Sequence, residues 1–355
     1  MLAWVAVARW GQSCGLAMRP TSPITRAAFS PFQGFGLPRR IADAVKVKVG
    51  RRTLLVGLVL VTGGGVALLV QRTGSRVFSA AATPDWRFLL AGLLVCAAVQ
   101  PLRALAWTST VRSPVGFRAM YAASSVGSFL DTVLPGRMGE ASKVAVLKVA
   151  AGPRWPGFSR AGGSLLCAHL LEMIAFVLVG AASAFFLPVP TWAKITMVVG
   201  LPLATGGLVL VSLLHRRLSH RLPEGVGSFL AGAAAPKRVM LRAGLILVVT
   251  WVARWFGVLF LLHAVGVHVG VGAALLYMVV TGLANTMPFL PGNVGIYQGA
   301  ALGALAMAGH GGTSAAAASV FTPAAGSLAT AAAAVVGLAF YGRRFGELRR
   351  AAVKF

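Results

Sequence analysis

Two short segments place polar and helix-breaking residues inside long apolar stretches of this 355-residue sequence. Residues 134–140 read LPGRMGE and residues 290–295 read LPGNVG. Proline interrupts a helix because it lacks an N–H group, and glycine lets another group approach the backbone closely. Non-helical backbone at membrane depth is tolerated only where it is buried in protein or lines a wet cavity. Both segments are therefore predicted to be breaks between two half-helices that border a polar site.

The first break has the residue types expected of an anion site. Its LPG sequence should end one half-helix, and a second should begin near Gly139, where free N–H groups and the positive helix end favour a phosphate. Arg137 adds a planar charge that can hold two phosphate oxygens. Glu140 lies in the first turn of the second half-helix, and Lys143 at i+3 can pair with it. Alternatively, Glu140 pairs with Lys143 or Arg137 to hold the bend, and such a pair can still exchange a partner for substrate.

Other ionisable residues fall within apolar runs. Asp131 precedes the first break, Glu172 lies in the middle of a long apolar run, and Arg254 lies in VTWVARWFGVLF. Each would cost roughly 2.5–3.5 kcal/mol at the centre of a lone inserted helix, so each should face the protein interior or water. Glu172 is expected to pair with Arg254 or Arg137. His169 is interpreted as a packing or hydrogen-bonding residue.

The second break has no charge. Asn293 and Gln298 take places that correspond to charged residues of the first break, together with Asn285 and Tyr297. These side chains can bind a polar headgroup or cap the broken helix, and capping is the role expected of Asn293. The two breaks are thus predicted to differ in chemistry, one charged and the other neutral.

The composition is that of a polytopic membrane protein, with 57% hydrophobic and 11% charged residues. Lys and Arg number 33 against seven acids, for a formal charge of +26. The basic residues cluster between apolar runs, as the positive-inside rule expects, so nucleic-acid binding is not predicted. The three cysteines and six histidines form no CxxC or HExxH pattern, so no metal, cofactor or disulfide framework is predicted.

Six apolar runs are long enough to cross a membrane, which takes about 20 residues. They are 53–71, 86–108, 162–187, 193–214, 243–266 and 314–341, and two further apolar regions, 118–151 and 272–309, contain the LPG breaks. Placing the basic loops inside puts 25 Lys/Arg on the inner side, four on the outer side and four within membrane segments. Arg103 is counted among the 25, as a marker of the inner end of the second span.

In this topology the first LPG region begins and ends inside, and the second begins and ends outside. Each half then consists of two spans, a re-entrant hairpin and a third span. Because three spans is an odd number, the second half crosses the membrane in the opposite orientation to the first. The predicted fold is an all-α polytopic membrane protein with an inverted-topology repeat and both termini cytoplasmic. The predicted domains are a transmembrane domain at 53–345, with halves of about 53–187 and 193–341, and basic cytosolic tails at 1–52 and 342–355. The first tail is Arg-rich and acid-poor like a transit peptide, but a poorly ordered tail or an early start site is the interpretation adopted.

The segment LPGRMGEASKVAVLK resembles the P-G-R-x-G-E signature of the lysylphosphatidylglycerol synthase transmembrane domain family, also called the flippase-like domain family. LLEM and LPGNVGIYQGA are similar to two further segments of that family, and the resemblance covers roughly residues 50–345. It implies a bacterial inner-membrane protein linked to lipid-headgroup translocation, with Arg137, Glu140 and Glu172 as site residues. Met173 and Gln298 depart from the family's pattern, which has Arg and an acid there. Only a short basic tail follows the last span, so lipid aminoacylation is not expected.

The function expected is translocation of a phospholipid, or another lipid with a phosphate headgroup, across the bacterial inner membrane. The alternatives are a non-transporting partner that presents lipid-linked substrate to another enzyme, and a small-solute secondary transporter. No catalytic residues are predicted, because no nucleophile or metal cluster is evident. Anionic lipids are the expected partners of the basic cytosolic flanks. The predicted substrate-binding residues are Asp131, Arg137, Gly139, Glu140, Lys143, Glu172, Arg254, Asn293 and Gln298.

Overall fold

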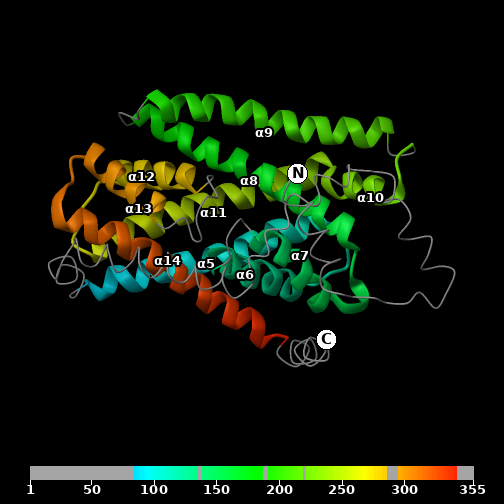
Figure 1. The fold of residues 1–355 in the computed structure, drawn as a ribbon, viewed down its shortest axis with the longest axis horizontal. Coiled ribbons are helices and arrows are strands. Elements are labelled where there is room, and N and C mark those ends of the chain that lie inside the picture. The colour runs from blue at the N-terminus through cyan, green and yellow to red at the C-terminus, as the bar shows by residue number, and fades with distance from the viewer. Residues whose placement is uncertain (1–83, 134–137, 187–190, 219–220, 286–294, 342–355) are drawn as a thin grey trace, which may run out of the picture. The chain divides into compact units, whose positions relative to one another are not determined.

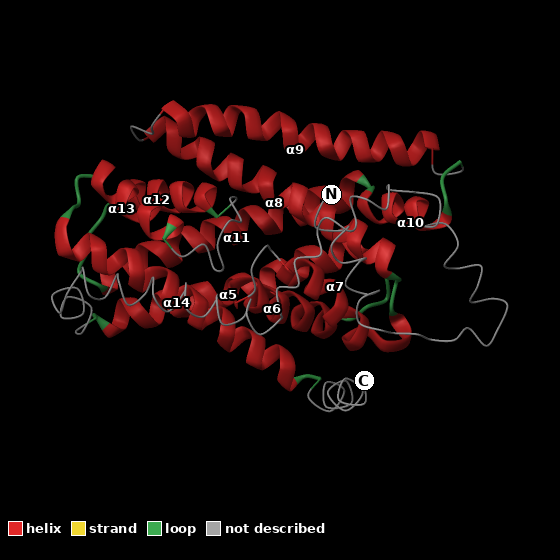
Figure 2. Cartoon of the chain, viewed as in Figure 1, coloured by secondary structure: helices red, strands yellow, loops and turns green. Residues whose placement is uncertain are grey.

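The computed structural model describes residues 84–133, 138–186, 191–218, 221–285 and 295–341, and every regular element in these ranges is a helix (Figures 1 and 2). The predicted span at 53–71, both tails and the LPG sequences themselves lie outside the described residues. Within the described ranges the prediction of an all-α membrane protein is confirmed.

Five helices are long and apolar enough to cross a membrane. They are α5 (Trp86–Val111), α8 (Phe158–Phe186), α9 (Thr191–Leu218), α11 (Lys237–Ala264) and α14 (Gly312–Ala339). At about 1.5 Å per residue, even the 26 residues of α5 exceed the roughly 30 Å of a bilayer's hydrocarbon core. Each helix overlaps one of the predicted apolar runs, because a long run without charge pairs satisfies its backbone in lipid only as a helix.

Each region with an LPG sequence forms two short helices. The first region forms α6 (Phe117–Val133) and α7 (Met138–Ala151), and the second forms α12 (Val271–Ala284) and α13 (Ile296–Met307). Helices of 12 to 17 residues are too short to cross the hydrocarbon core alone. This is the pattern of paired half-helices that the sequence predicts. The inverted-topology relation between the two regions stays a prediction.

Glycines let α6 and α7 lie against each other in an antiparallel hairpin. A Cβ on Gly127 would overlap the side chain of Lys143, and a Cβ on Gly139 would overlap the backbone of Asp131. The pairs 127 with 143 and 131 with 139 define one antiparallel register between α6 and α7. The close approach therefore requires glycine at 139 whether or not a ligand binds there.

Helices α5 and α11 are also antiparallel neighbours in close contact. A Cβ on Gly92 would lie 2.8 Å from the Leu261 side chain, and one on Gly257 would lie 2.9 Å from the Cys96 sulfur. Extending this register by one helical turn brings Gln100 level with the residue before Arg254. The arginines of the two helices, Arg103 and Arg254, therefore lie at neighbouring levels of the interface.

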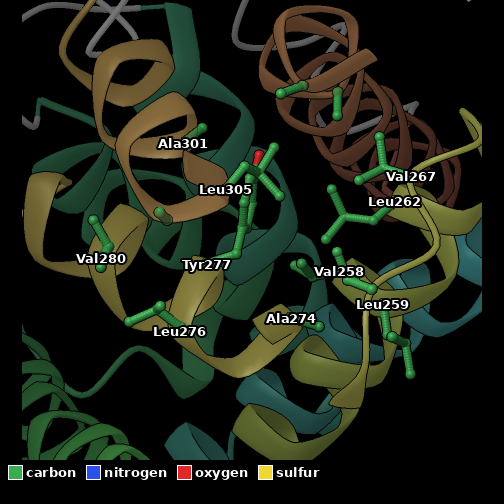
Figure 3. Packing of buried hydrophobic residues seen from close by; sticks show 14 of the residues in the cluster. Val258, Leu259, Leu262, Val267, Ala274, Leu276, Tyr277, Val280, Ala301 and Leu305 are labelled. Atoms are coloured by element: carbon green, nitrogen blue, oxygen red, sulfur yellow. The ribbon is translucent and has the colours of Figure 1, made fainter. Parts of the chain in front are cut away.

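Two apolar cores hold the hairpins in place. The core of the first hairpin joins α6 and α7 to the ends of α5 and α8 through residues such as Trp107, Met120 and Leu147. The core of the second hairpin joins α12 and α13 to α11 and α14 around the fully buried Tyr277, with Leu262 and Leu305 (Figure 3). Side chains of α5, α8 and α14 thus anchor the first hairpin, and side chains of α11 and α14 anchor the second.

A short helix was not predicted. Residues 215–242 lie between the predicted spans 193–214 and 243–266, where a basic inner loop is expected, but they contain α10 (Glu224–Ala233), which packs against α8. The Arg112 side chain donates a hydrogen bond to the carbonyl of Ala231, and a Cβ on Gly232 would overlap the backbone of Arg160. The helix is only ten residues long and basic residues flank it, so the sequence did not indicate it as a separate apolar helix.

Candidate functional site

Five side chains from three helices form a continuous series of polar contacts, which we call the charged chain: Lys143, Glu140, His169, Glu172 and Arg103. Lys143 Nζ donates to Glu140 Oε1 at 2.6 Å, and His169 Nε2 lies 2.6 Å from Glu140 Oε2. The other nitrogen of His169, Nδ1, is 3.7 Å from Glu172 Oε2. Arg103 Nη2 donates to Glu172 Oε1. The imidazole therefore lies between two carboxylates, each of which also has a cationic partner.

The local sequence explains how these groups meet. Glu140 lies in the first turn of α7, where the helix dipole favours a carboxylate, and Lys143 follows it on the same face at i+3. His169 and Glu172 are likewise three residues apart, so α8 presents both to one side. An ionised carboxylate only accepts hydrogen bonds, so Nε2 of His169 carries a hydrogen and donates the hydrogen bond to Glu140. The shared face of α8 links the half-helix α7 to the spanning helix α5.

The charged chain is partly accessible rather than sealed. The side chain of His169 is 38% exposed and that of Glu140 is 27% exposed, although both residues lie on helices of the apolar bundle. Charged groups at this depth face protein or water and not lipid tails. A polar group of a substrate can therefore reach Glu140 and His169 without disrupting the apolar cores.

Arg254 lies beside the charged chain but outside its contacts. Its guanidinium stacks on the ring of Trp251, with the central carbon 5.1 Å from the ring centre, and it interacts electrostatically with Arg103 and Glu172. Among the described residues, no carboxylate lies within ion-pair distance of Arg254. The predicted pairing of Glu172 with Arg254 is wrong, because Arg103 pairs with Glu172 instead. The alternative partner, Arg137, lies outside the described residues, so that pairing stays a prediction.

Among the described residues of the charged chain, taken together with Arg254, the charges do not cancel. Three permanent cations, Lys143, Arg103 and Arg254, stand against two carboxylates, Glu140 and Glu172, which leaves a net charge of +1 when His169 is neutral. A positive charge that is partly buried and lacks a counter-ion is unfavourable until an anion binds. The arrangement can thus receive one phosphate or carboxylate group.

The structure divides the residues predicted for the site. It brings Glu140, Lys143 and Glu172 into the charged chain and places Arg254 beside it. Arg137 and Asn293 lie outside the described residues.

The remaining predicted residues have other surroundings. Asp131 and Gly139 lie against each other across the hairpin. Gln298 caps α13, because its Oε1 accepts a hydrogen bond from the Gly295 N–H at 2.6 Å. The capping role predicted for Asn293 stays a prediction, because that residue lies outside the described ranges.

Arg103 is the main residue that the sequence interpretation missed. It was read as a marker of the inner end of a span, but α5 continues to Val111 and Arg103 lies within the helix. Arg103 and Arg254 are each the eighteenth residue of their helices, α5 and α11. This shared position is a signal that could have identified Arg103.

Three hydroxyl side chains extend the polar region into the second hairpin. Tyr297 interacts electrostatically with Arg254, and the hydroxyl of Tyr277 lies near both Tyr297 and Thr322. Tyr277 and Thr322 are buried, and neither hydroxyl reaches hydrogen-bond geometry with a described partner. Tyr297 was predicted as a polar residue of the second break, whereas Tyr277 and Thr322 were not predicted, because tyrosine and threonine are common in apolar helices.

A family model described as the lysylphosphatidylglycerol synthase TM region matches residues 54–334 of the chain. This range includes every described helix that contributes to the charged chain and nearly all of α14. No match was found among curated proteins or among solved structures.

Proposed function

The chain belongs to the lysylphosphatidylglycerol synthase TM-region family, and from this premise we propose that it translocates a lipid with a phosphate headgroup across the bacterial inner membrane. It is a multi-pass membrane protein with five described helices of spanning length. The proposal includes cytoplasmic termini, as the distribution of basic residues predicts, and a role without catalysis.

The observation that supports this function best is the accessible charged chain with a surplus cation beside it. A purely structural ion-pair network would balance its charges, since each uncompensated charge within a membrane protein is costly. Here Arg254 has no acidic partner among the described residues, while Glu140 and His169 are open to an incoming group. Such a site suits the reversible binding of an anion.

The proposed mechanism assigns different tasks to the two signs of charge. The phosphate of the headgroup binds Arg254, which is already positioned by its stacking on Trp251. The carboxylates Glu140 and Glu172 contact a cationic part of the headgroup or exchange protons through His169, which lies between them. The lipid tails remain in the bilayer while the headgroup crosses.

A transport assay tests the proposal directly. Purified protein is reconstituted in liposomes that contain fluorescent phospholipids with neutral, anionic or lysyl-modified headgroups, and transbilayer movement is measured by chemical quenching of the outer leaflet. Arg254→Gln and Glu140→Gln should each slow movement at least tenfold, because each removes a charge of the site. The matched control is Arg242→Gln, which removes an exposed arginine from the same helix, α11.

The outcomes separate the candidate functions. Equal loss in Arg242→Gln, or normal movement in both site variants, would contradict the assigned site. No movement of any lipid by well-folded native protein that still binds lipid would instead support a partner that presents lipid-linked substrate to an enzyme. Uptake of a soluble anion without lipid movement would support a small-solute transporter.

A further inference from the structure

A cavity lies at the basic ends of the helices, apart from the charged chain. Its volume is about 700 Å³. Its lining comes from the residues around the start of α6, the end of α7 with the 3-10 turn Gly152–Arg154 that follows, and a residue two positions after the end of α14: Val115, Gly116, Phe117, Arg118, Ala119, Ala150, Ala151, Pro153, Arg154 and Tyr341. Ala150 is ten residues beyond Glu140 on the same helix, which corresponds to about 15 Å along its axis. The cavity is therefore a second place, distinct from the proposed translocation site.

The cavity has an apolar floor and a cationic rim. Val115, Ala119 and Ala150 are buried, whereas Arg118 and Arg154 are exposed. The guanidinium of Arg118 is held over the ring of Phe340, 5.7 Å from its centre. Among the described residues, neither arginine has a carboxylate within ion-pair distance. A ligand that matches this lining has an anionic group next to apolar surface.

The surroundings strengthen the positive potential. No acid occurs in the sequence from 112 to 130 or from 141 to 171, the two stretches that supply most of the lining. Lys148 lies over the ring of Phe158, 5.0 Å from its centre, and the aromatic rings of Phe117 and Phe158 are exposed. Exposed aromatic rings together with basic side chains are typical of helix ends at the membrane–water interface.

We propose that this cavity binds the headgroup of one anionic phospholipid of the adjacent leaflet. Arg118 and Arg154 would hold the phosphate and the lipid tails would follow the apolar helix surfaces, whether or not the protein translocates lipids. A cavity of this volume is of the size that encloses small organic ligands, and basic pockets between membrane helices suit anionic headgroups.

The chain's own tails are poor occupants of this cavity. Residues 342–355 contain five Lys/Arg and one acid, and residues 1–52 contain nine Lys/Arg and one acid. Both would be repelled by the cationic rim, whereas an anionic lipid is attracted. The cationic rim therefore favours an anionic lipid over either tail as the occupant of the cavity.

Native mass spectrometry of the full chain in detergent tests the proposal by counting bound lipids. The titrants are phosphatidylglycerol, phosphatidylcholine and free glycerol 3-phosphate. Native protein should bind one phosphatidylglycerol in clear preference to phosphatidylcholine, and millimolar glycerol 3-phosphate should not displace it. The double variant Arg118→Gln/Arg154→Gln should bind phosphatidylglycerol roughly tenfold or more weakly. The matched control, Arg238→Gln/Arg242→Gln, removes two exposed arginines from the start of α11 and should bind normally.

A second variant blocks the cavity without changing its charge. Gly116 lines the cavity, and a Cβ there meets no atom within 4 Å, so Gly116→Trp can fill the space while the chain folds normally. It should reduce lipid binding as strongly as the arginine variant. Gly206→Trp on α9, where a Cβ also meets no atom, is its control. Equal losses in either control, undiminished binding in Gly116→Trp, or displacement by free glycerol 3-phosphate would overturn the proposal.

Discussion

The two hairpins of this protein have similar architecture and opposite chemistry. Each consists of two short helices, α6 with α7 and α12 with α13, anchored by an apolar core to spanning helices. At the start of α7 stands Glu140, paired with Lys143 and His169, whereas at the start of α13 stands Gln298, which caps its own helix. Similar backbones thus support a charged site with contacts to another helix in the first hairpin and a self-capped helix start in the second.

The spanning helices repeat this difference. Arg103 and Arg254 hold the same position in α5 and α11, yet Arg103 has Glu172 as partner, while Arg254 has an aromatic ring, Trp251. The paired arginine stabilises the bundle, and the other arginine remains available to an anion. The comparison teaches that the position of a charge follows the architecture, while its role follows from whether a neighbouring helix supplies a counter-charge.

The largest expected effect comes from breaking the paired arginine. Glu172→Gln should lower the free energy of unfolding by about 3 kcal/mol, because it leaves Arg103 uncompensated beside Arg254. The measurement is unfolding by SDS titration in mixed micelles. Glu224→Gln, at an exposed position of α10, is the matched control and should change stability by less than about 0.5 kcal/mol.

A second substitution sharpens that test. Adding Arg103→Gln to Glu172→Gln removes the orphaned cation and should restore part of the lost stability. A double variant as unstable as the sum of the two single variants would show that the pair contributes no coupling, and the contrast between the two arginines would fail.

The next effect separates the two hairpins by their glycines. Gly139→Ala should destabilise the protein by about 1–3 kcal/mol, because the new Cβ overlaps the backbone of Asp131. Gly299→Ala in α13 meets no atom within 4 Å and should be neutral or stabilising by up to about 1 kcal/mol, since alanine favours the helix. The same SDS titration compares the two variants. Equal effects would mean that the first hairpin is no more tightly packed than the second.

The sequence was informative where length and local chemistry decide the structure. The long apolar runs predicted α5, α8, α9, α11 and α14, and the LPG sequences predicted where two regions divide into shorter helices. The pairing of Glu140 with Lys143 was also predictable, because three residues separate them on one helix.

Contacts between helices could not be derived in this way. Whether Glu172 meets Arg103 or Arg254 depends on how α5, α8 and α11 are rotated about their axes, and all three are apolar on most sides. Reading Arg103 as the end of a span also hid it, because an arginine within a helix and one at its end look alike in sequence. The family signature predicted site residues in the first hairpin, whereas the partner of Glu172, Arg103, belongs to the spanning helix α5.

The smallest expected effect tests the neutral side of the comparison. In Gln298→Ala the Gly295 N–H loses its acceptor, so stability should fall by about 0.5–1 kcal/mol. Lipid movement should remain within twofold of the native rate, because Gln298 serves its own helix. Gln298→Glu keeps the acceptor and adds a favourable charge at the helix start, and should restore stability. Loss of movement in Gln298→Ala, with movement restored by Gln298→Glu, would show instead that the second hairpin also binds the headgroup, and the division between a charged site and a neutral support would no longer hold.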